Sequence, residues 1–186
     1  MIQIRRENAM IRSNSARDFR EYICIIVFLW FISGCMIFAQ PAGTSGFWIE
    51  LGIGGGSVGE GGGSISLNAC CQKNRNLFSG RIIGCGELFG RTLNDYGILY
   101  NRVFHSSALL MTFGGGLGVV TGHISHGLFS SKDPEDIAPV IGLPLEARLF
   151  IRPLSFLGLG LFGFANINAE ESFYGATLSL SMGKLR

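Results

Sequence analysis

The chain has 186 residues, of which 47% are hydrophobic, only 15% are charged and 28 are glycine. Soluble domains carry about 25% charged residues, and the high apolar content excludes an intrinsically disordered chain. The formal charge of +2 comes from residues 1–39, with five Arg and three acidic residues, because residues 40–186 hold ten basic and ten acidic residues. A body without net charge offers no basic field for nucleic acid, so we expect no nucleic-acid partner.

Residues 1–39 are predicted to form a helical signal peptide. Five arginines precede an apolar run at 22–38, and Ala39 supplies the small residue expected before a cleavage site. We therefore expect export and cleavage after Ala39, which leaves 40–186 as the mature chain. Two alternatives remain open. The segment ending in Cys35 resembles a lipobox, which would make Cys35 a lipidated N-terminus, and the apolar run could also be retained as an anchor.

After the leader, apolar and polar side chains alternate, which predicts β-strands whose two faces meet different surroundings. The clearest case is 141–152, where every second residue is aliphatic and the opposite row contains Glu146 and Arg148. The facing of the fourth segment is ambiguous, and its Arg102 must face inward or lie near a rim. In chain order, the predicted strands are 46–55, 63–72, 77–89, 95–104, 108–121, 141–152, 154–166 and 173–185.

The aliphatic rows recur along the whole body, and no helices or second sheet are available to cover them all. Lipid is the simplest cover, and most segments reach the 9–11 residues that a tilted strand needs to cross a bilayer. Eight is the smallest usual strand number for such barrels, which have short turns on one side and longer loops on the other. The longest predicted connection, 122–138, follows an odd-numbered strand, as this pattern requires. We predict an all-β, eight-stranded, antiparallel, up-and-down transmembrane barrel over 40–186.

The predicted inward rows contain ionisable side chains, which would be costly on a lipid-facing surface. An eight-stranded barrel has an interior just wide enough for side chains to fill. We therefore expect a structural network of ion pairs that plugs the lumen, rather than the selectivity ring of a pore, and no cofactor. Its predicted members are Glu50, Arg81, Glu87, Glu146 and Arg148.

The body resembles the small outer-membrane β-barrels of the OmpA/OmpX type found in diderm bacteria. The resemblance is carried by the strand pattern over residues 44–186, including 141–147, 156–160 and 163–166. It implies a location in the outer membrane, contact with its lipid and insertion by the barrel-insertion machinery. One departure concerns the C-terminus, because such barrels usually end in an aromatic residue and this chain ends in Leu185 and Arg186.

Two short motifs suggest other chemistry. Residues 54–59 satisfy G-x-G-x-x-G, but glycine and a strand pattern follow where a nucleotide-binding motif requires a helix. His123 and Ser125 resemble the His-x-Ser element of lipid A deacylase barrels, in which the histidine acts as base to the serine. The residue after that serine is His126, where the family has Asn. No Cys and His cluster has metal-ligand spacing.

The sequence thus favours a non-enzymatic role in the outer membrane. We expect a membrane scaffold or surface-contact protein that acts through its external loops, with an external partner that the sequence does not identify. One alternative is a lipid-modifying enzyme that uses His123 and Ser125. A second is a soluble lipocalin-like binding barrel tethered to the membrane, which would place the aliphatic rows inside and the charges outside.

Overall fold

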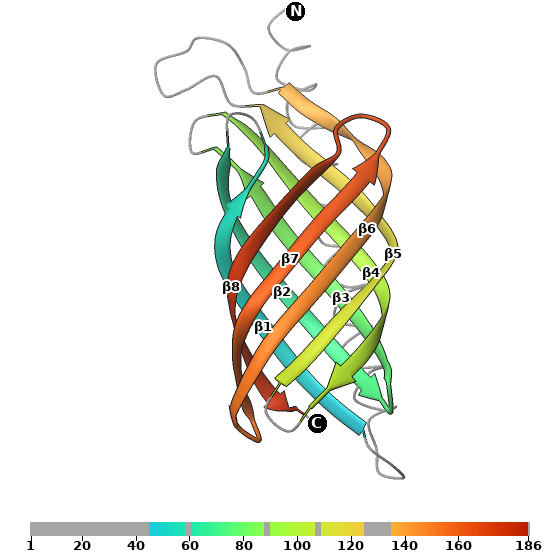
Figure 1. The fold of residues 1–186 in the computed structure, drawn as a ribbon. Helices are drawn as coiled ribbons and strands as arrows, with labels where there is room; N and C mark the ends of the chain where they lie inside the picture. The colour runs from blue at the N-terminus through green and yellow to red at the C-terminus, as the bar shows by residue number, and fades with distance from the viewer. Residues whose placement is uncertain (1–44, 59–60, 88–89, 107–108, 125–134, 186) are drawn as a thin grey trace, which may run out of the picture. The chain divides into compact units, whose positions relative to one another are not determined.

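The structure, a computed structural model, describes residues 45–58, 61–87, 90–106, 109–124 and 135–185. Each strand pairs antiparallel with the next, and β1 pairs with β8 to close the barrel (Figure 1). The described residues include no helix long and apolar enough to span a membrane. The predicted signal peptide, with Cys35 and Ala39, lies outside them. The strands are β1 (Ser45–Gly56), β2 (Gly62–Lys73), β3 (Asn76–Gly86), β4 (Arg91–His105), β5 (Leu109–Ile124), β6 (Glu135–Leu154), β7 (Leu157–Asn168) and β8 (Phe173–Lys184). The predicted all-β, eight-stranded antiparallel barrel is confirmed.

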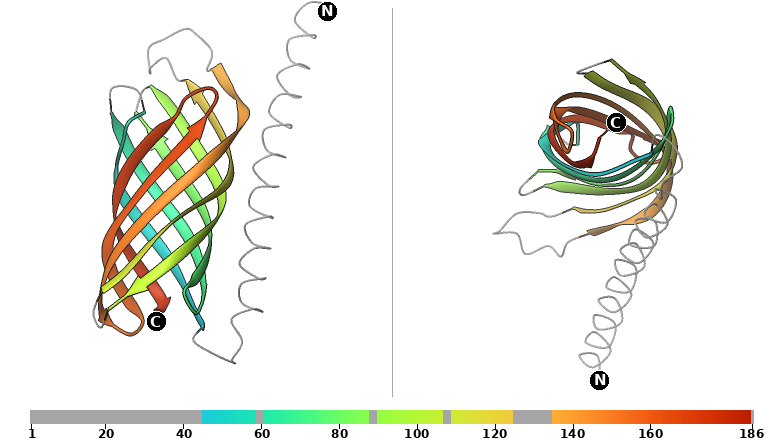
Figure 2. Two further views of the ribbon diagram at one scale, coloured as in Figure 1. Left: turned by 45° about the vertical axis from the view of Figure 1, so that its right-hand side comes forward. Right: turned by 90° about the horizontal axis from the view of Figure 1, so that it is seen from below.

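The connections differ in length between the two ends of the barrel. Even-numbered strands are followed by the short connections 74–75, 106–108 and 155–156. Odd-numbered strands are followed by the connections 57–61, 87–90, 125–134 and 169–172. The start of β1 and the end of β8 lie at the end with the short connections (Figures 1 and 2). We call this the short-turn end and the opposite end the loop end.

Several predicted strand boundaries were wrong, and those of β6 show the reason. The predicted strands 141–152 and 154–166 place the turn between them at Pro153, whereas it lies at 155–156, because β6 runs on to Leu154 through an irregularity in its pairing with β7. Proline lacks a backbone N–H and is accommodated where the strand ladder is interrupted. β6 also begins at Glu135, so part of the predicted long connection is strand. Alternation identifies a strand but does not show where its pairing stops.

The tight turn between β2 and β3 follows from its residues. Asn74 has a φ of 59°, a left-handed conformation that Asn adopts more readily than most residues. The Gln72 side chain donates a hydrogen bond of 2.7 Å to the Asn74 carbonyl, which holds the reversal in place. Lys73 then pairs with Asn76 in the first register position of the hairpin.

The two faces of the strands are as different as the alternation predicts. On β6, the side chains from Ile141 to Ile151 alternate strictly between exposed and buried. The ambiguous β4 buries Leu99, Asn101 and Val103 and exposes Ile98 and Tyr100. Arg102 is exposed on the outer face near the short-turn end, where its Nη1 donates to Asn76 Oδ1 at 2.6 Å. The arrangement is the reverse of a lipocalin-like barrel, which would bury the aliphatic rows.

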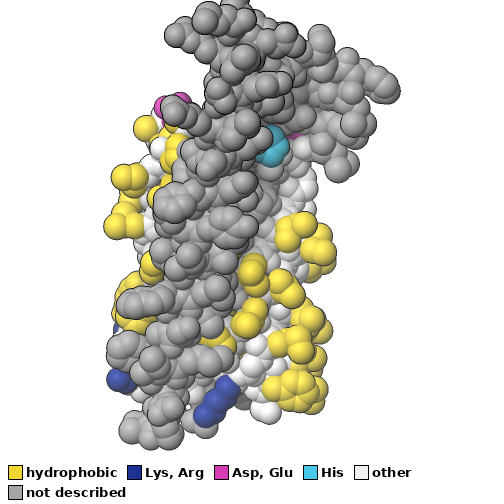
Figure 3. All heavy atoms as spheres, turned by 180° about the vertical axis from the view of Figure 1, so that it is seen from behind, with side chains coloured by type: hydrophobic (Ala, Val, Ile, Leu, Met, Phe, Trp, Pro, Cys, Tyr) yellow, Lys and Arg dark blue, Asp and Glu magenta, His cyan; other side chains and the backbone are white. Residues whose placement is uncertain are grey.

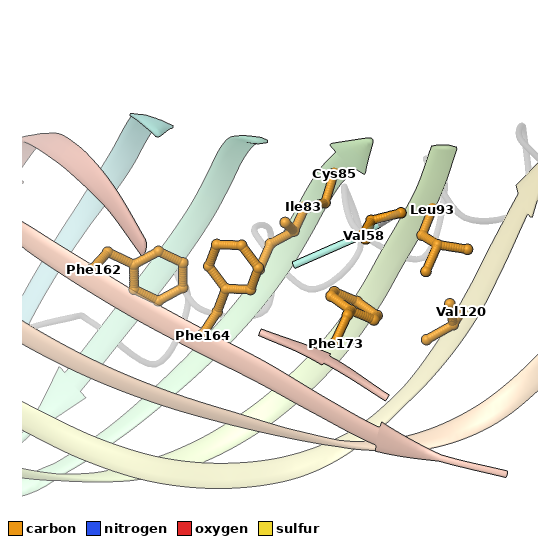
Figure 4. Close-up of a cluster of buried hydrophobic side chains, with 8 residues drawn as sticks. All are labelled: Val58, Ile83, Cys85, Leu93, Val120, Phe162, Phe164 and Phe173. Atoms are coloured by element: carbon orange, nitrogen blue, oxygen red, sulfur yellow. The ribbon is translucent and has the colours of Figure 1, made fainter. Parts of the chain in front are cut away.

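The interior of the barrel has three layers along its axis. Two clusters of buried apolar side chains lie toward its two ends, with a belt of buried polar side chains between them. Toward the short-turn end the apolar layer consists of Trp48, Cys70, Leu77, Val103, Leu110, Phe150 and Leu185. Toward the loop end, as Figure 4 shows, it consists of Val58, Ile83, Cys85, Leu93, Val120, Phe162, Phe164 and Phe173.

Gly160 shows why glycine occupies some inward positions. It pairs with Phe150 across β6 and β7, and the Phe150 ring lies over it. A Cβ at this position would overlap the Leu149 carbonyl oxygen and lie 2.6 Å from Phe150 Cδ1. The absence of a side chain therefore makes room for a large aromatic ring in the short-turn layer.

Replacing Gly160 with Ala is expected to lower the free energy of unfolding by about 1–3 kcal/mol, because overpacking displaces the ring or the backbone. Urea titration of the protein folded in phosphatidylcholine bilayers would measure the loss. Gly63→Ala is the matched control, since nothing lies within 4 Å of a Cβ at Gly63. Equal stability of the two variants would contradict the close packing.

Candidate functional site

The polar belt, which fills the middle layer of the lumen, is the main concentration of ionisable side chains in the described part of the chain. Strand alternation points its members inward, and their side chains are fully or nearly fully buried. The belt contains two guanidinium groups and three carboxyl groups with amides and hydroxyls around them. Its central members are Glu50, Asn68, Ser79, Arg81, Asp95, Asn101, Glu146, Arg148 and Asn166.

Arg148 links two carboxyl groups that come from opposite parts of the sequence. Its Nε donates to Glu50 Oε2 at 2.9 Å, and its Nη1 donates to Glu146 Oε1 at 2.5 Å. All three side chains are fully buried. The guanidinium carbon also lies 4.9 Å from the centre of the Phe162 ring, a cation–π contact at the border with the loop-end apolar layer.

Arg81 holds the second part of the belt. It forms a buried ion pair with Asp95 on the neighbouring strand β4. Its Nη1 donates to the backbone carbonyl of Leu145 at 2.9 Å, and its Nη2 also donates to that of Ala165 at 3.0 Å. Arg81 Nη1 is also 3.9 Å from Glu146 Oε2, so Glu146 lies between the two arginines and connects them.

Each carboxyl group of the belt accepts from an arginine and from an amide. Asn68 donates to Glu50 at 3.3 Å, and Asn166 donates to Asp95 at 3.1 Å. Glu146 Oε1 accepts from Asn101 at 2.7 Å and from the Ser79 hydroxyl at 2.5 Å. Burying a charge is costly unless it is both paired and hydrogen-bonded, and this arrangement supplies both kinds of partner.

The structure brings four of the five sequence-predicted residues together, namely Glu50, Arg81, Glu146 and Arg148. Glu87 lies apart from them, just beyond the end of β3, where its side chain is half-buried against Gly90. Six residues of extended strand separate it from Arg81, about 20 Å at 3.3 Å per residue. Asp95 was not predicted, because it lies on the strand whose facing was ambiguous.

The belt has the chemistry of a structural network. Its carboxyl groups are occupied by arginine and amide donors and are shielded from solvent. Among the described residues, no three His, Cys, Asp or Glu side chains are grouped in a way that could hold a metal ion. The three described cysteines, Cys70, Cys71 and Cys85, are buried and unbonded to one another.

The predicted catalytic alternative lies at the loop end. His123 is exposed near the end of β5, opposite Asp136 in the register of β5 and β6. Ser125, its predicted nucleophile, lies outside the described residues. The structure therefore places a histidine opposite an acidic residue at the rim, and the predicted catalytic role of Ser125 stays a prediction.

Comparisons with known proteins place the chain by its fold. No family model matches the sequence, and no curated protein matches it. Among solved structures, Neisserial surface protein A (NspA) is similar with a TM-score of 0.58 and 13% identity, covering 78% of this chain and 99% of that one. The N-terminal β-barrel domain of Pseudomonas aeruginosa OprF has a TM-score of 0.55 and 9% identity, covering 73% and 96%. The attachment invasion locus protein Ail of Yersinia pestis has a TM-score of 0.54 and 13% identity, covering 78% and 100%. The chain therefore has the fold of the small eight-stranded outer-membrane β-barrels, as its strand pattern predicts.

Proposed function

We propose that this protein is an outer-membrane barrel with a packed, non-conducting lumen, which acts as a membrane scaffold and makes external contacts through its loops. The observation that carries the proposal is the three-layered interior. A pore needs a continuous aqueous path, whereas here a belt of ion-paired side chains lies between two apolar layers. An interior of eight strands filled by side chains is typical of small barrels.

The outer surface supports placement in lipid. Large apolar side chains are exposed on all eight strands, including Ile53 on β1, Ile141 on β6 and Leu178 on β8, each more than 70% exposed. Soluble monomers rarely expose apolar patches larger than a few hundred Å². Figure 3 shows hydrophobic side chains spread over the height of one face. Closure of the sheet supplies the internal hydrogen bonds that a lipid-embedded backbone requires.

A scaffold role assigns the external contacts to the loop end. The longest connection, 125–134, lies there between β5 and β6. Barrels of this class present their longer loops outside the cell and their short turns to the periplasm. One of the structural neighbours is named an attachment protein. This supports a surface-contact role for the fold and does not identify a partner for this chain.

The packed lumen is tested by electrical recording. We expect the purified protein, reconstituted into planar phosphatidylcholine bilayers, to give no unitary current steps above those of the bare bilayer, because clusters of buried apolar side chains lie on both sides of the polar belt. The same preparation must show the heat-dependent gel mobility of a folded barrel. Stable current steps from folded protein would overturn the non-conducting assignment.

The orientation is tested by cysteine labelling in cells. Ser172 and Ser155 are both exposed and lie in connections at opposite ends of the barrel. We expect a membrane-impermeant maleimide to label Ser172→Cys on intact cells, and Ser155→Cys only after the outer membrane is permeabilised. The unsubstituted protein is the background control, since its described cysteines are buried. The reverse labelling pattern would contradict the orientation.

A further inference from the structure

Charged side chains outside the lumen are sorted by sign between the two ends of the barrel. At the short-turn end, five basic side chains form what we call the basic rim: Lys73, Arg75, Arg102, Arg152 and Lys184. No acidic residue of the described part lies at this end. The acidic residues outside the lumen that the structure describes lie at the loop end, at positions 87, 135, 136, 170 and 171, with Arg91 paired to Glu171. Figure 3 shows this separation on one face, with basic groups at the lower edge and acidic groups near the upper edge.

Three members of the basic rim belong to the outward-facing rows of their strands. Lys73 is exposed and has the strand parity of the outward-facing Ile65 on β2, although Ala69 and Cys71 between them are buried, and Lys184 continues the exposed row of Leu178 and Met182 on β8. Lys73 and Lys184 pair with Ser45 and Phe47 of β1 and therefore flank that strand. These side chains extend sideways from the wall of the barrel, in the direction of the surrounding lipid, rather than along its axis.

Arg102 occupies the same level beside a group of outward-facing aromatic rings. Tyr100 and Arg102 both donate to Asn76 Oδ1, at 2.9 Å and 2.6 Å. Tyr100 packs edge-on against Phe78 with ring centroids 5.4 Å apart, and Phe104 stacks on Phe113 at 5.5 Å. Amphipathic aromatic side chains gather at membrane–water interfaces, and long basic side chains near them extend to the headgroups. In a bilayer, the basic rim is therefore expected at the headgroup level.

We propose that the three outward-row cations of the basic rim, Lys73, Arg102 and Lys184, bind the phosphate groups of anionic phospholipids in the leaflet at the short-turn end. This inference rests on the proposed placement of the barrel in a membrane and adds a lipid class that the barrel would select. A soluble acidic partner would be met by groups that point along the barrel axis. The three outward-row cations, without acidic neighbours among the described residues, instead match phosphates that surround the wall. Basic residues near an anionic membrane surface each contribute about a fivefold gain in binding.

The test uses the purified full chain, as the host processes it, in micelles that contain equal amounts of phosphatidylglycerol and phosphatidylcholine. Native mass spectrometry counts the lipids that each barrel retains. We expect wild-type protein to retain phosphatidylglycerol in preference to phosphatidylcholine. The triple variant Lys73→Gln/Arg102→Gln/Lys184→Gln should lose at least about tenfold of that preference, and 0.5 M salt should weaken it in the wild type, because salt screens exposed charges at about this concentration.

Three further variants separate the explanations. Lys73→Arg/Arg102→Lys/Lys184→Arg keeps the charges and should keep the preference. Arg75→Gln/Arg152→Gln, at the same rim but outside the outward rows, and Arg91→Gln, at the loop end, should change it less than twofold. The proposal is overturned if wild-type protein retains both lipids equally, or if the rim variants instead reduce binding to purified peptidoglycan or to an acidic periplasmic protein.

The same samples distinguish this proposal from the membrane placement itself. Insertion of the wild type into pure phosphatidylcholine vesicles, scored by protection from protease and by heat-dependent gel mobility, tests the placement alone. Failure to insert would contradict both the membrane placement and the lipid selection. Insertion without any preference for phosphatidylglycerol would contradict only the lipid selection.

Discussion

Replacing Arg148 with Met is expected to lower the free energy of unfolding by about 3–5 kcal/mol, the cost of removing one partner from a buried ion pair. The substitution preserves most of the side-chain length but leaves Glu50 and Glu146 without their shared guanidinium, which is 2.9 Å from one carboxyl oxygen and 2.5 Å from the other. Urea titration in phosphatidylcholine bilayers would measure the change, provided that the slope of the unfolding free energy against urea concentration is the same in the variant and the wild type.

Two comparisons isolate the charge effect. Arg152 lies on the same strand as Arg148 but at the rim, where it is partly exposed. Arg152→Met should therefore lower the free energy of unfolding by less than about 1 kcal/mol, as expected for a charge near the surface. The double variant Glu50→Gln/Arg148→Met should be less destabilised than Arg148→Met. It removes the charge of Glu50, which would have no arginine partner, whereas Glu146 still has Arg81 at 3.9 Å. If Arg148→Met unfolds at the same urea concentration as wild type, the belt is not the tightly coupled network that its geometry indicates.

The outward rows and most of the inward charges could be predicted from the sequence, because a period of two separates lipid-facing from lumen-facing residues. Glu146 and Arg148 belong to an unbroken alternation, so their direction was determined without coordinates. Arg81 and Glu87 share the same row of the predicted strand 77–89, yet only Arg81 reaches the belt, since Glu87 lies six residues further along the chain, beyond the end of β3. A pattern of alternation gives the direction of a side chain but not its height in the barrel.

Asp95 could not be predicted for a related reason. β4 carries aromatic or aliphatic side chains on both rows, so neither row is clearly the lipid-facing one. One feature of the sequence did indicate the facing of this strand. An aspartate within a spanning strand is expected to face inward, and Leu99 and Asn101 lie on the same row as Asp95. The layers of the interior depend on which residues of different strands meet, and that information comes from the register of the closed sheet.

The basic rim illustrates how a functional feature can be hidden in a neutral composition. Ten basic and ten acidic residues after position 39 give no net charge, and the sequence alone supports no strong electrostatic attraction. The up-and-down topology then brings the ends of β2, β4, β6 and β8 to one side of the barrel. Each of these ends carries a basic residue. Charge is thus separated along the axis by the order of the strands.

Replacing Leu145 with Arg is expected to destabilise the folded barrel by about 2–4 kcal/mol in a bilayer, the cost of a lipid-facing arginine at mid-depth. Leu145 is 45% exposed, lies near the middle of β6 and pairs with Gly115 and Ala165 on the two neighbouring strands. Urea titration in phosphatidylcholine bilayers would again measure the loss. In a soluble barrel an exposed Leu→Arg change would usually stay within about 0.5 kcal/mol.

Leu154→Arg provides the matched control for depth. Leu154 is similarly exposed, at 49%, but ends β6 at the short-turn end, where arginine reaches the headgroups and should cost about 0–1 kcal/mol. The difference between the two variants therefore reports the depth of lipid around the barrel and not merely the effect of a new charge. If both substitutions are equally mild, water rather than lipid covers the middle of the wall. The placement of this protein in a membrane would then be wrong, although its fold would stand.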